Sequence, residues 1–165
     1  MKYLKLVELY EKLDSTTKRL QKTHYISQLL MNVSEDLIDQ FLLLVQGKIF
    51  PDYMDKKIGI SSKLAIKAIS KTTGHSDKEI EKKWKELGDL GDVAKELLSK
   101  KKQSSLFPKE LYLKQVFSNL RKLSDQSGMG SVDTKLNIIS EMLIDATPME
   151  SKYLIRSEKI KLSIN

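Results

Sequence analysis

The sequence predicts an all-α protein of about nine helices in two pseudo-symmetric lobes. Apolar residues recur at spacings of three and four along nearly the whole chain, which is the period of an amphipathic helix. No long run alternates apolar and polar residues, as a half-buried strand would. The 165 residues suit one domain, expected over residues 1–165, with residues 1–102 and 110–165 as candidate sub-lobes.

The first part of the chain predicts three helices. The first carries the apolar residues from Leu4 to Leu13. The second is expected to begin near Asp14 or Ser15 and to carry Leu20 among its apolar residues. The third ends at Gly47, because glycine favours the position that closes a helix.

The middle of the chain predicts three more helices with clear start and stop signals. The fourth begins near Ser61 or Ser62 and ends at Gly74. Ser76 and Glu79 have the spacing of a capping box, in which each side chain bonds the other residue's backbone N–H at a helix start. This box predicts the start of the fifth helix, and the sixth follows directly.

A linker at residues 103–109 is expected to separate these helices from the last three. The seventh helix carries Val116 and Phe117, and the eighth follows the glycine turn at residues 128–130. Thr147, Pro148 and Glu150 supply a cap, a proline at the first helical position and an acid at the third, which predicts the start of the ninth helix.

The charge balance favours an anionic partner. Lys and Arg number 29 against 22 Asp and Glu, so the net charge is +7 and the pI is about 9.4. Such a surface attracts polyanions, although a generic basic solvated surface has the same composition. The absence of cysteine excludes disulfides and thiolate chemistry. The most apolar run, residues 37–45, is too short to span a bilayer, so we expect a cytoplasmic protein without a membrane segment, and by default a monomer.

Two short segments resemble each other. Residues 62–66 read Ser-Lys-Leu-Ala-Ile after a glycine at 59, and residues 134–138 read Thr-Lys-Leu-Asn-Ile after a glycine at 130. Each is followed, thirteen or fourteen residues after its hydroxyl residue, by a predicted capping box. The pattern indicates one unit used twice, namely a glycine loop, a helix, a turn and a capped helix, and we interpret it as two helical hairpins related by a rough twofold axis.

These helix starts have the chemistry of a phosphate-binding loop. Glycine lets the backbone approach a ligand closely, a helix N-terminus offers unpaired N–H groups, and serine, threonine and lysine add a hydroxyl donor and a charge. The alternative is that both loops are ordinary helix caps. The residues expected to contact DNA phosphates are Gly59, Ser61, Ser62, Lys63 and Lys67 at one loop, Gly128, Gly130, Ser131, Thr134 and Lys135 at the other, and Lys48 as a weaker third contact.

Other residues with possible chemistry favour structural roles. His24 and His75 are the only histidines, and without cysteine they do not form a metal-binding pattern. Asp89 and Asp92 suit a helix cap and a first turn better than a paired-carboxylate metal site. Trp84 has core spacing, as do Tyr3, Tyr10, Phe41 and Phe117, although tryptophan can also stack on a base.

The chain resembles the N-terminal domain of archaeal and eukaryotic ATP-dependent DNA ligases. The order and spacing of several short pieces carry the resemblance, namely residues 9–13, 17–20, 46–52, 59–63, 66–70, 88–94, 128–135 and 150–156. The resemblance implies an all-helical domain that binds nicked duplex DNA across the minor groove, largely through phosphates and sugars and independently of sequence. It also implies roles in DNA repair, replication and recombination, and catalytic domains that follow in the chain.

The sequence lacks the chemistry of the full enzyme. The family's adenylated lysine lies in a Lys-x-Asp-Gly motif, which does not occur here. We therefore expect this chain alone to be inactive and to hold no cofactor, with ATP and Mg²⁺ belonging to the complete ligase. The ligase catalytic domains and a sliding clamp are further candidate partners. The alternative is a helical protein-interaction module or scaffold, which charge alone does not distinguish from a DNA-binding module.

Overall fold

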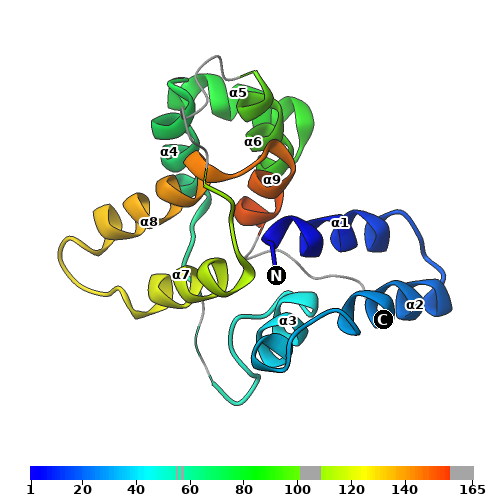
Figure 1. Ribbon diagram of the computed structural model, residues 1–165. Helices are drawn as coiled ribbons and strands as arrows, with labels where there is room; N and C mark the ends of the chain where they lie inside the picture. Colours follow the sequence, from blue (N-terminus) through cyan, green and yellow to red (C-terminus); the bar gives the residue numbers. More distant parts are fainter. Residues whose placement is uncertain (55, 57, 101–108, 157–165) are drawn as a thin grey trace.

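The protein is all-α, as predicted. The computed structural model describes residues 1–54, 56, 58–100 and 109–156 (Figure 1). Within these residues there are nine α-helices and no β-strand. The helices are α1 (Tyr3–Asp14), α2 (Arg19–Leu30), α3 (Ile38–Val45), α4 (Ser62–Thr73), α5 (Asp77–Leu87), α6 (Leu90–Ser99), α7 (Leu113–Asp125), α8 (Ser131–Asp145) and α9 (Pro148–Arg156), with a 3₁₀ turn at Glu35–Leu37 before α3.

Helices from both candidate sub-lobes share one apolar core. The two most extensive helix contacts are α6 with α9 and α4 with α8, so each joins a helix before residue 100 to one after residue 110 (Figure 1). Four of the five aromatic residues predicted as core are buried, namely Tyr3, Tyr10, Phe41 and Phe117. Most of the predicted linker, residues 103–108, lies outside the described residues.

Capping interactions place the helix starts where the sequence predicted them. The Ser76–Glu79 capping box is formed in full at the start of α5. At the start of α9, the Glu150 N–H donates to Thr147 Oγ1 at 3.2 Å, and Glu150 accepts from the Thr147 N–H at 2.8 Å. Asp89 caps α6 by accepting from the Asp92 N–H at 3.0 Å, as expected. Local sequence therefore fixes these three boundaries.

The predicted start of the second helix was wrong. α2 begins at Arg19 instead of near Asp14 or Ser15. The Thr16 hydroxyl accepts from the Lys18 N–H at 3.2 Å and donates to Gln21 at 2.6 Å, a local bonding pattern that competes with helix formation. No residue of α2 is buried, and Leu20 is 86% exposed. Ile26, Leu29 and Leu30 of this helix nevertheless pack, partly buried, against the core, so the apolar spacing located the core-facing side except at Leu20.

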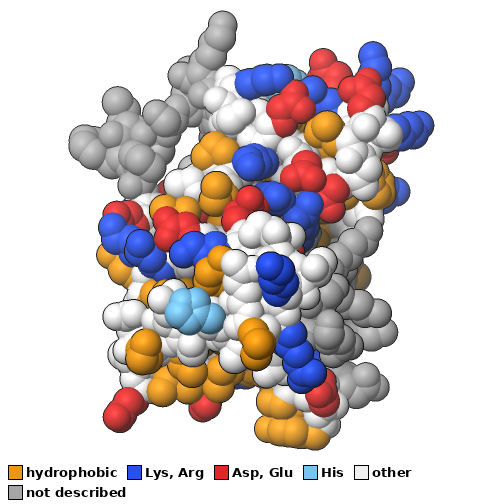
Figure 2. Space-filling view, turned by 90° about the vertical axis from the view of Figure 1, so that its right-hand side faces the viewer, with side chains coloured by type: hydrophobic (Ala, Val, Ile, Leu, Met, Phe, Trp, Pro, Cys, Tyr) orange, Lys and Arg blue, Asp and Glu red, His pale blue; other side chains and the backbone are white. Residues whose placement is uncertain are grey.

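A cluster of ion pairs connects α9 to α6 and α1. Arg156 Nε lies 2.9 Å from Asp89 Oδ1, and Arg156 Nη2 lies 3.0 Å from Asp92 Oδ2. Lys152 Nζ lies 2.8 Å from Glu11 Oε1 on α1. Viewed from the side on which α1 and α2 project, positive and negative side chains are intermingled over the surface (Figure 2). Much of the charge on this side is therefore balanced within the protein.

Gly91 allows α6 to approach α9 closely. A Cβ at this position would lie 2.5 Å from the Lys152 carbonyl oxygen and 2.9 Å from Arg156 Cγ. The nearest atom belongs to the backbone of α9, so a side-chain rotation cannot relieve the clash.

We predict that Gly91→Ala separates α6 from α9 and lowers the free energy of unfolding by about 1–3 kcal/mol, the usual cost of overpacking. The better helix propensity of alanine offsets part of that cost. Urea denaturation measures the change. Ser118→Ala, at an exposed position of α7, is the control and should change stability by less than about 0.5 kcal/mol. A stable Gly91→Ala variant would contradict the close approach.

The ion pairs also predict how stability depends on pH. Burial by itself raises the pKa of the Asp89 carboxyl, but hydrogen bonds from Arg156 and the Asp92 N–H outweigh it and hold the pKa below its ordinary value. A carboxyl with a lowered folded-state pKa stabilises the fold above its unfolded-state pKa. That contribution is lost as the pH falls through the folded-state pKa.

Arg156→Gln should therefore lower the free energy of unfolding at pH 7 by about 1–3 kcal/mol, the range for hydrogen bonds to charged groups. The difference from the parent should shrink as the pH falls below about 4, where carboxyls protonate. Urea denaturation between pH 3 and pH 7 measures both. Lys100→Gln, which breaks an exposed ion pair with Glu96, should cost less than about 1 kcal/mol. A constant difference across this pH range would show that Arg156 acts through packing alone.

Candidate functional site

The residues predicted to contact DNA lie at the surface. All eleven are exposed or half-buried, and none belongs to the core. Ten of them lie in or next to the loops that lead into α4 and α8, and the eleventh is Lys48, in the loop after α3. The positions are therefore accessible to a macromolecular ligand.

The start of α4 combines a cap with exposed donors. Gly59 has a φ of +72°, which only glycine adopts readily. Ser61 is the N-cap and accepts from the Leu64 N–H at 3.2 Å, so its hydroxyl hydrogen is free to donate elsewhere. Ser62 and Lys63 follow as the first two helical residues, and the first turn carries no acid. This end of α4 therefore presents hydroxyls and a cation, with no acid in its own first turn.

The start of α8 differs from that of α4. Gly130, with a φ of +82°, is the N-cap and offers no side chain. Ser131 is the first helical residue, whereas Thr134 is the fourth and donates its hydroxyl to the Gly130 carbonyl oxygen at 3.2 Å. Asp133 places a carboxylate in this first turn. The segment order of the predicted repeat is present, but Ser62 and Thr134 occupy different helical positions, so their pairing was wrong.

Packing of α4 against α8 brings Lys135 next to the loop before α4. A Cβ on Gly59 would lie 3.0 Å from Lys135 Nζ, so this ammonium group reaches the loop before α4. The start of α8 lies four residues before Lys135, or about 6 Å along the helix axis at 1.5 Å per residue. The Lys135 side chain therefore connects the second turn of α8 with the loop before α4.

Three of the predicted lysines have no counter-ion among the residues that the structure describes. Within the described parts of the chain, Lys63, Lys67 and Lys135 form no ion pair. Lys48, by contrast, lies 2.7 Å from Asp52. The α4–α8 surface thus holds uncompensated positive charge, and Lys48 is the least suited of the eleven to bind an anion.

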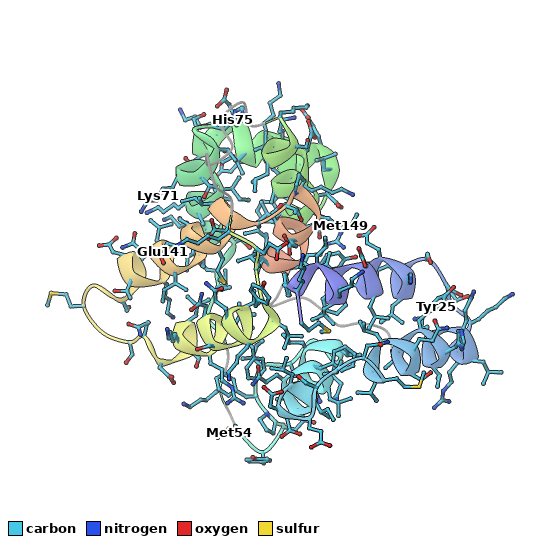
Figure 3. All side chains as sticks on the ribbon, viewed as in Figure 1. Tyr25, Met54, Lys71, His75, Glu141 and Met149 are labelled. Carbon is cyan, nitrogen blue, oxygen red and sulfur yellow. The ribbon has the colours of Figure 1, made fainter. Side chains whose placement is uncertain are left out.

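One cation of this surface was missed in the sequence. Lys71 lies on α4, one turn beyond Lys67, and projects from the outer side of the α4–α8 pair (Figure 3). Its Nζ donates to Asn137 Oδ1 of α8 at 2.7 Å. The four-residue spacing of Lys63, Lys67 and Lys71 was the available signal, because it places all three on one helix face.

A hollow borders the start of α4. It has a volume of about 240 Å³ and is lined by residues that include Ser61, Ser62, Trp84 and Arg156. Trp84, predicted as core, is only half-buried, because it packs against the core on one side and lines this hollow on the other.

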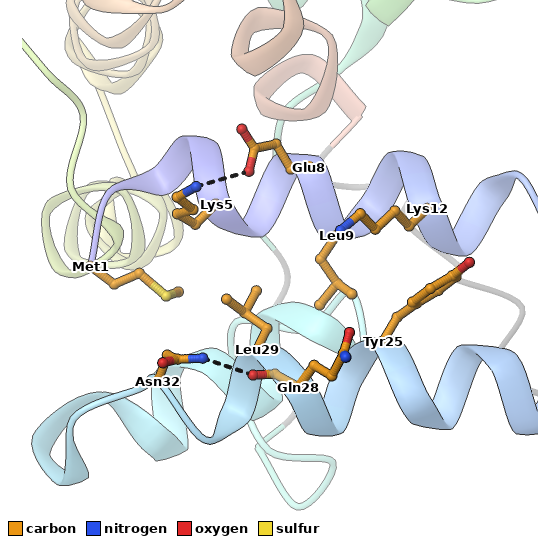
Figure 4. A pocket seen from close by; sticks show the side chains of 9 residues that line it. All are labelled: Met1, Lys5, Glu8, Leu9, Lys12, Tyr25, Gln28, Leu29 and Asn32. Carbon is orange, nitrogen blue, oxygen red and sulfur yellow. Dashed lines mark hydrogen bonds and ion pairs between the residues drawn. The ribbon is translucent and has the colours of Figure 1, made fainter.

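The larger cavity contains none of the predicted residues. It lies between α1 and α2, has a volume of about 450 Å³ and is shown in Figure 4. Lys5 and Glu8 form an ion pair at 3.4 Å along its edge, and the Lys12 ammonium lies 5.8 Å from the Tyr25 ring centre. Its charged groups are thus engaged with their neighbours.

The described residues offer no metal centre. No group of three or more His, Asp or Glu side chains converges among them to hold a metal ion. His75 instead lies 3.7 Å from Glu79 in the cap of α5. None of the helices described has the length and apolar character needed to cross a membrane.

Comparison with known proteins identifies the family. A family model described as DNA ligase N terminus matches residues 2–165, and the chain belongs to this family. It is 42% identical over 98% of its length to a DNA ligase of Methanosphaera stadtmanae, and 39% identical over 95% to one of Thermococcus onnurineus. A DNA ligase of Nitrosopumilus maritimus is 34% identical over 94% of the chain. The chain spans 30%, 28% and 26% of the length of these three relatives.

Proposed function

We propose that this chain is the duplex-binding part of an ATP-dependent DNA ligase and that its α4–α8 surface contacts the sugar–phosphate backbone of nicked DNA. The observation that carries the proposal is the reach of Lys135 from α8 to the Gly59 loop before α4. This contact joins the start of α4 to the second turn of α8, and among the described residues Lys63, Lys67 and Lys135 form no ion pair, so the proposed surface is cationic. Phosphate contacts fix a protein on the duplex and carry no sequence information directly, so binding is independent of sequence.

Catalysis and cofactor binding belong elsewhere in the proposed enzyme. The chain has no Lys-x-Asp-Gly motif to accept an adenylate, and the described residues hold no carboxylate cluster for Mg²⁺. We therefore propose that ATP and Mg²⁺ are bound by other parts of the ligase. Its role in the proposed ligase is to hold the duplex while other domains, and in replication a sliding clamp, act on it.

The direct experiment is a salt titration of binding to a nicked and an intact duplex of one sequence. The titration is then repeated with a nicked duplex of a second, unrelated sequence. Counter-ion release makes phosphate binding fall steeply between 50 and 200 mM salt. We expect that steep loss, with equal affinity for the two sequences. Salt-insensitive or absent duplex binding would overturn the proposal and favour a protein-interaction module.

Lys63→Ala and Lys135→Ala should each weaken binding on every sequence and reduce the slope of log affinity against log salt by about one. Lys63 should matter more, because Asp133 offsets part of the charge at the start of α8. Fluorescence anisotropy across the salt range measures both effects. Lys82→Ala on the exposed face of α5 removes the same charge and is the control. Unchanged binding of both variants at low salt would exclude these loops as the contact.

A further inference from the structure

The cationic surface of α4 extends well beyond the start of the helix. Lys63, Lys67 and Lys71 are all exposed, whereas Leu64, Ala68 and Thr72, the residues that follow each of them, are buried. A spacing of four residues keeps the three lysines on one face of the helix. We call these three residues the lysine stripe.

The length of the lysine stripe suits a nucleic-acid strand. Eight residues separate Lys63 from Lys71, which is about 12 Å along the axis at 1.5 Å per residue. Successive phosphates rise about 3.4 Å along the axis of a duplex and also turn around it, so along one strand they lie about 7 Å apart. The stripe therefore has the length to meet about three successive phosphates.

Asn137 positions the last lysine without neutralising it. Lys71 Nζ donates to Asn137 Oδ1 at 2.7 Å, and the partner is a neutral amide. Lys48 and Lys56, by contrast, are each paired with a carboxylate, Asp52 and Asp125 respectively. An ammonium group has three donors, so Lys71 keeps its charge and further N–H groups for an anion.

The charges around the stripe support an anionic ligand. Residues 56–76 contain five lysines and no Asp or Glu. Two acids of α8, Asp133 one turn before Asn137 and Glu141 one turn beyond it, border this surface, and Figure 3 shows Glu141 on the same outer side as Lys71. Figure 2, which views another side of the molecule, shows charges of both signs intermingled. Lys63, Lys67 and Lys71 thus form a run of cations on a helix that carries no acid of its own.

We propose that the lysine stripe follows one strand of the duplex along the axis of α4, with Lys71 at its far end and Asn137 as the residue that positions Lys71. This inference rests on the proposed function and deepens it. It gives the direction in which the strand crosses the protein, and it adds one contact residue, Lys71, and one positioning residue, Asn137.

The experiment is a salt titration of binding to the nicked duplex with matched variants. Lys71→Ala should weaken binding several-fold at 50 mM salt and reduce the slope by about 0.9, the value for one lost phosphate contact. Lys71→Arg should retain the slope. Asn137→Asp keeps Lys71 but places a carboxylate beside its ammonium group. This variant should therefore reduce both the affinity and the slope of log affinity against log salt, as Lys71→Ala does.

The controls separate a local contact from a change of net charge. Lys82→Ala on α5 removes one positive charge, and Gln28→Glu on α2 adds one negative charge, both away from the stripe. Each should change affinity by less than about twofold and leave the slope unchanged. Glu141→Gln should strengthen binding, because it removes the bordering carboxylate.

The outcomes distinguish this inference from the proposed function. If the parent binds duplex with a steep salt dependence but Lys71→Ala and Asn137→Asp keep its slope, the stripe does not extend to Lys71, while the proposed function stands. If the controls reduce the slope as much as Lys71→Ala, the effect is one of net charge and the stripe is again excluded. If the parent shows no salt-dependent duplex binding, both proposals fail.

Discussion

The packing of α4 against α8 is the contact on which the candidate site depends. The two helices are separated by more than fifty residues, and each carries only part of the proposed chemistry. Because they pack together, Lys135 reaches the Gly59 loop and Asn137 holds Lys71. Separating the two helices would leave two ordinary helix starts, each with isolated cations.

Charge is distributed unevenly between structural and candidate binding surfaces. The junction of α1, α6 and α9 pairs its cations with acids, as in the contacts of Arg156 with Asp89 and of Lys152 with Glu11. These pairs stabilise the arrangement of the helices. The lysines of α4 have no such partners among the described residues, and exposed charges cost little in water. The fold can therefore maintain a surface that attracts anions without a large loss of stability.

Local signals allowed much of the helical fold to be predicted. The capping boxes at Ser76–Glu79 and Thr147–Glu150 act within four residues, so the sequence alone locates them. The start of α2 was wrong because the Thr16 hydroxyl forms local bonds that hydrophobic spacing does not register. The exposure of Leu20 depends on which helices pack together, and the spacing of apolar residues in the sequence does not specify the packing partners of a helix.

The candidate site was predictable in part. The glycines and lysines at the two helix starts are visible in the sequence, and the structure places them at the surface. The similarity of residues 62–66 and 134–138 led to a wrong pairing of Ser62 with Thr134. Similar sequences need not start at the same helical position, and α8 begins three residues before Thr134. The role of Asn137 was not predictable, because it depends on a contact between residues 66 positions apart.

The most direct test of this account is an NMR titration of the ¹⁵N-labelled chain with nicked duplex at low salt. The account predicts that the largest amide shift changes fall in residues 58–71 and 128–137 and that they disappear when salt is raised. Shift changes confined to α1 and α2, or spread evenly over all helices, would contradict the assignment of the α4–α8 surface as the DNA contact.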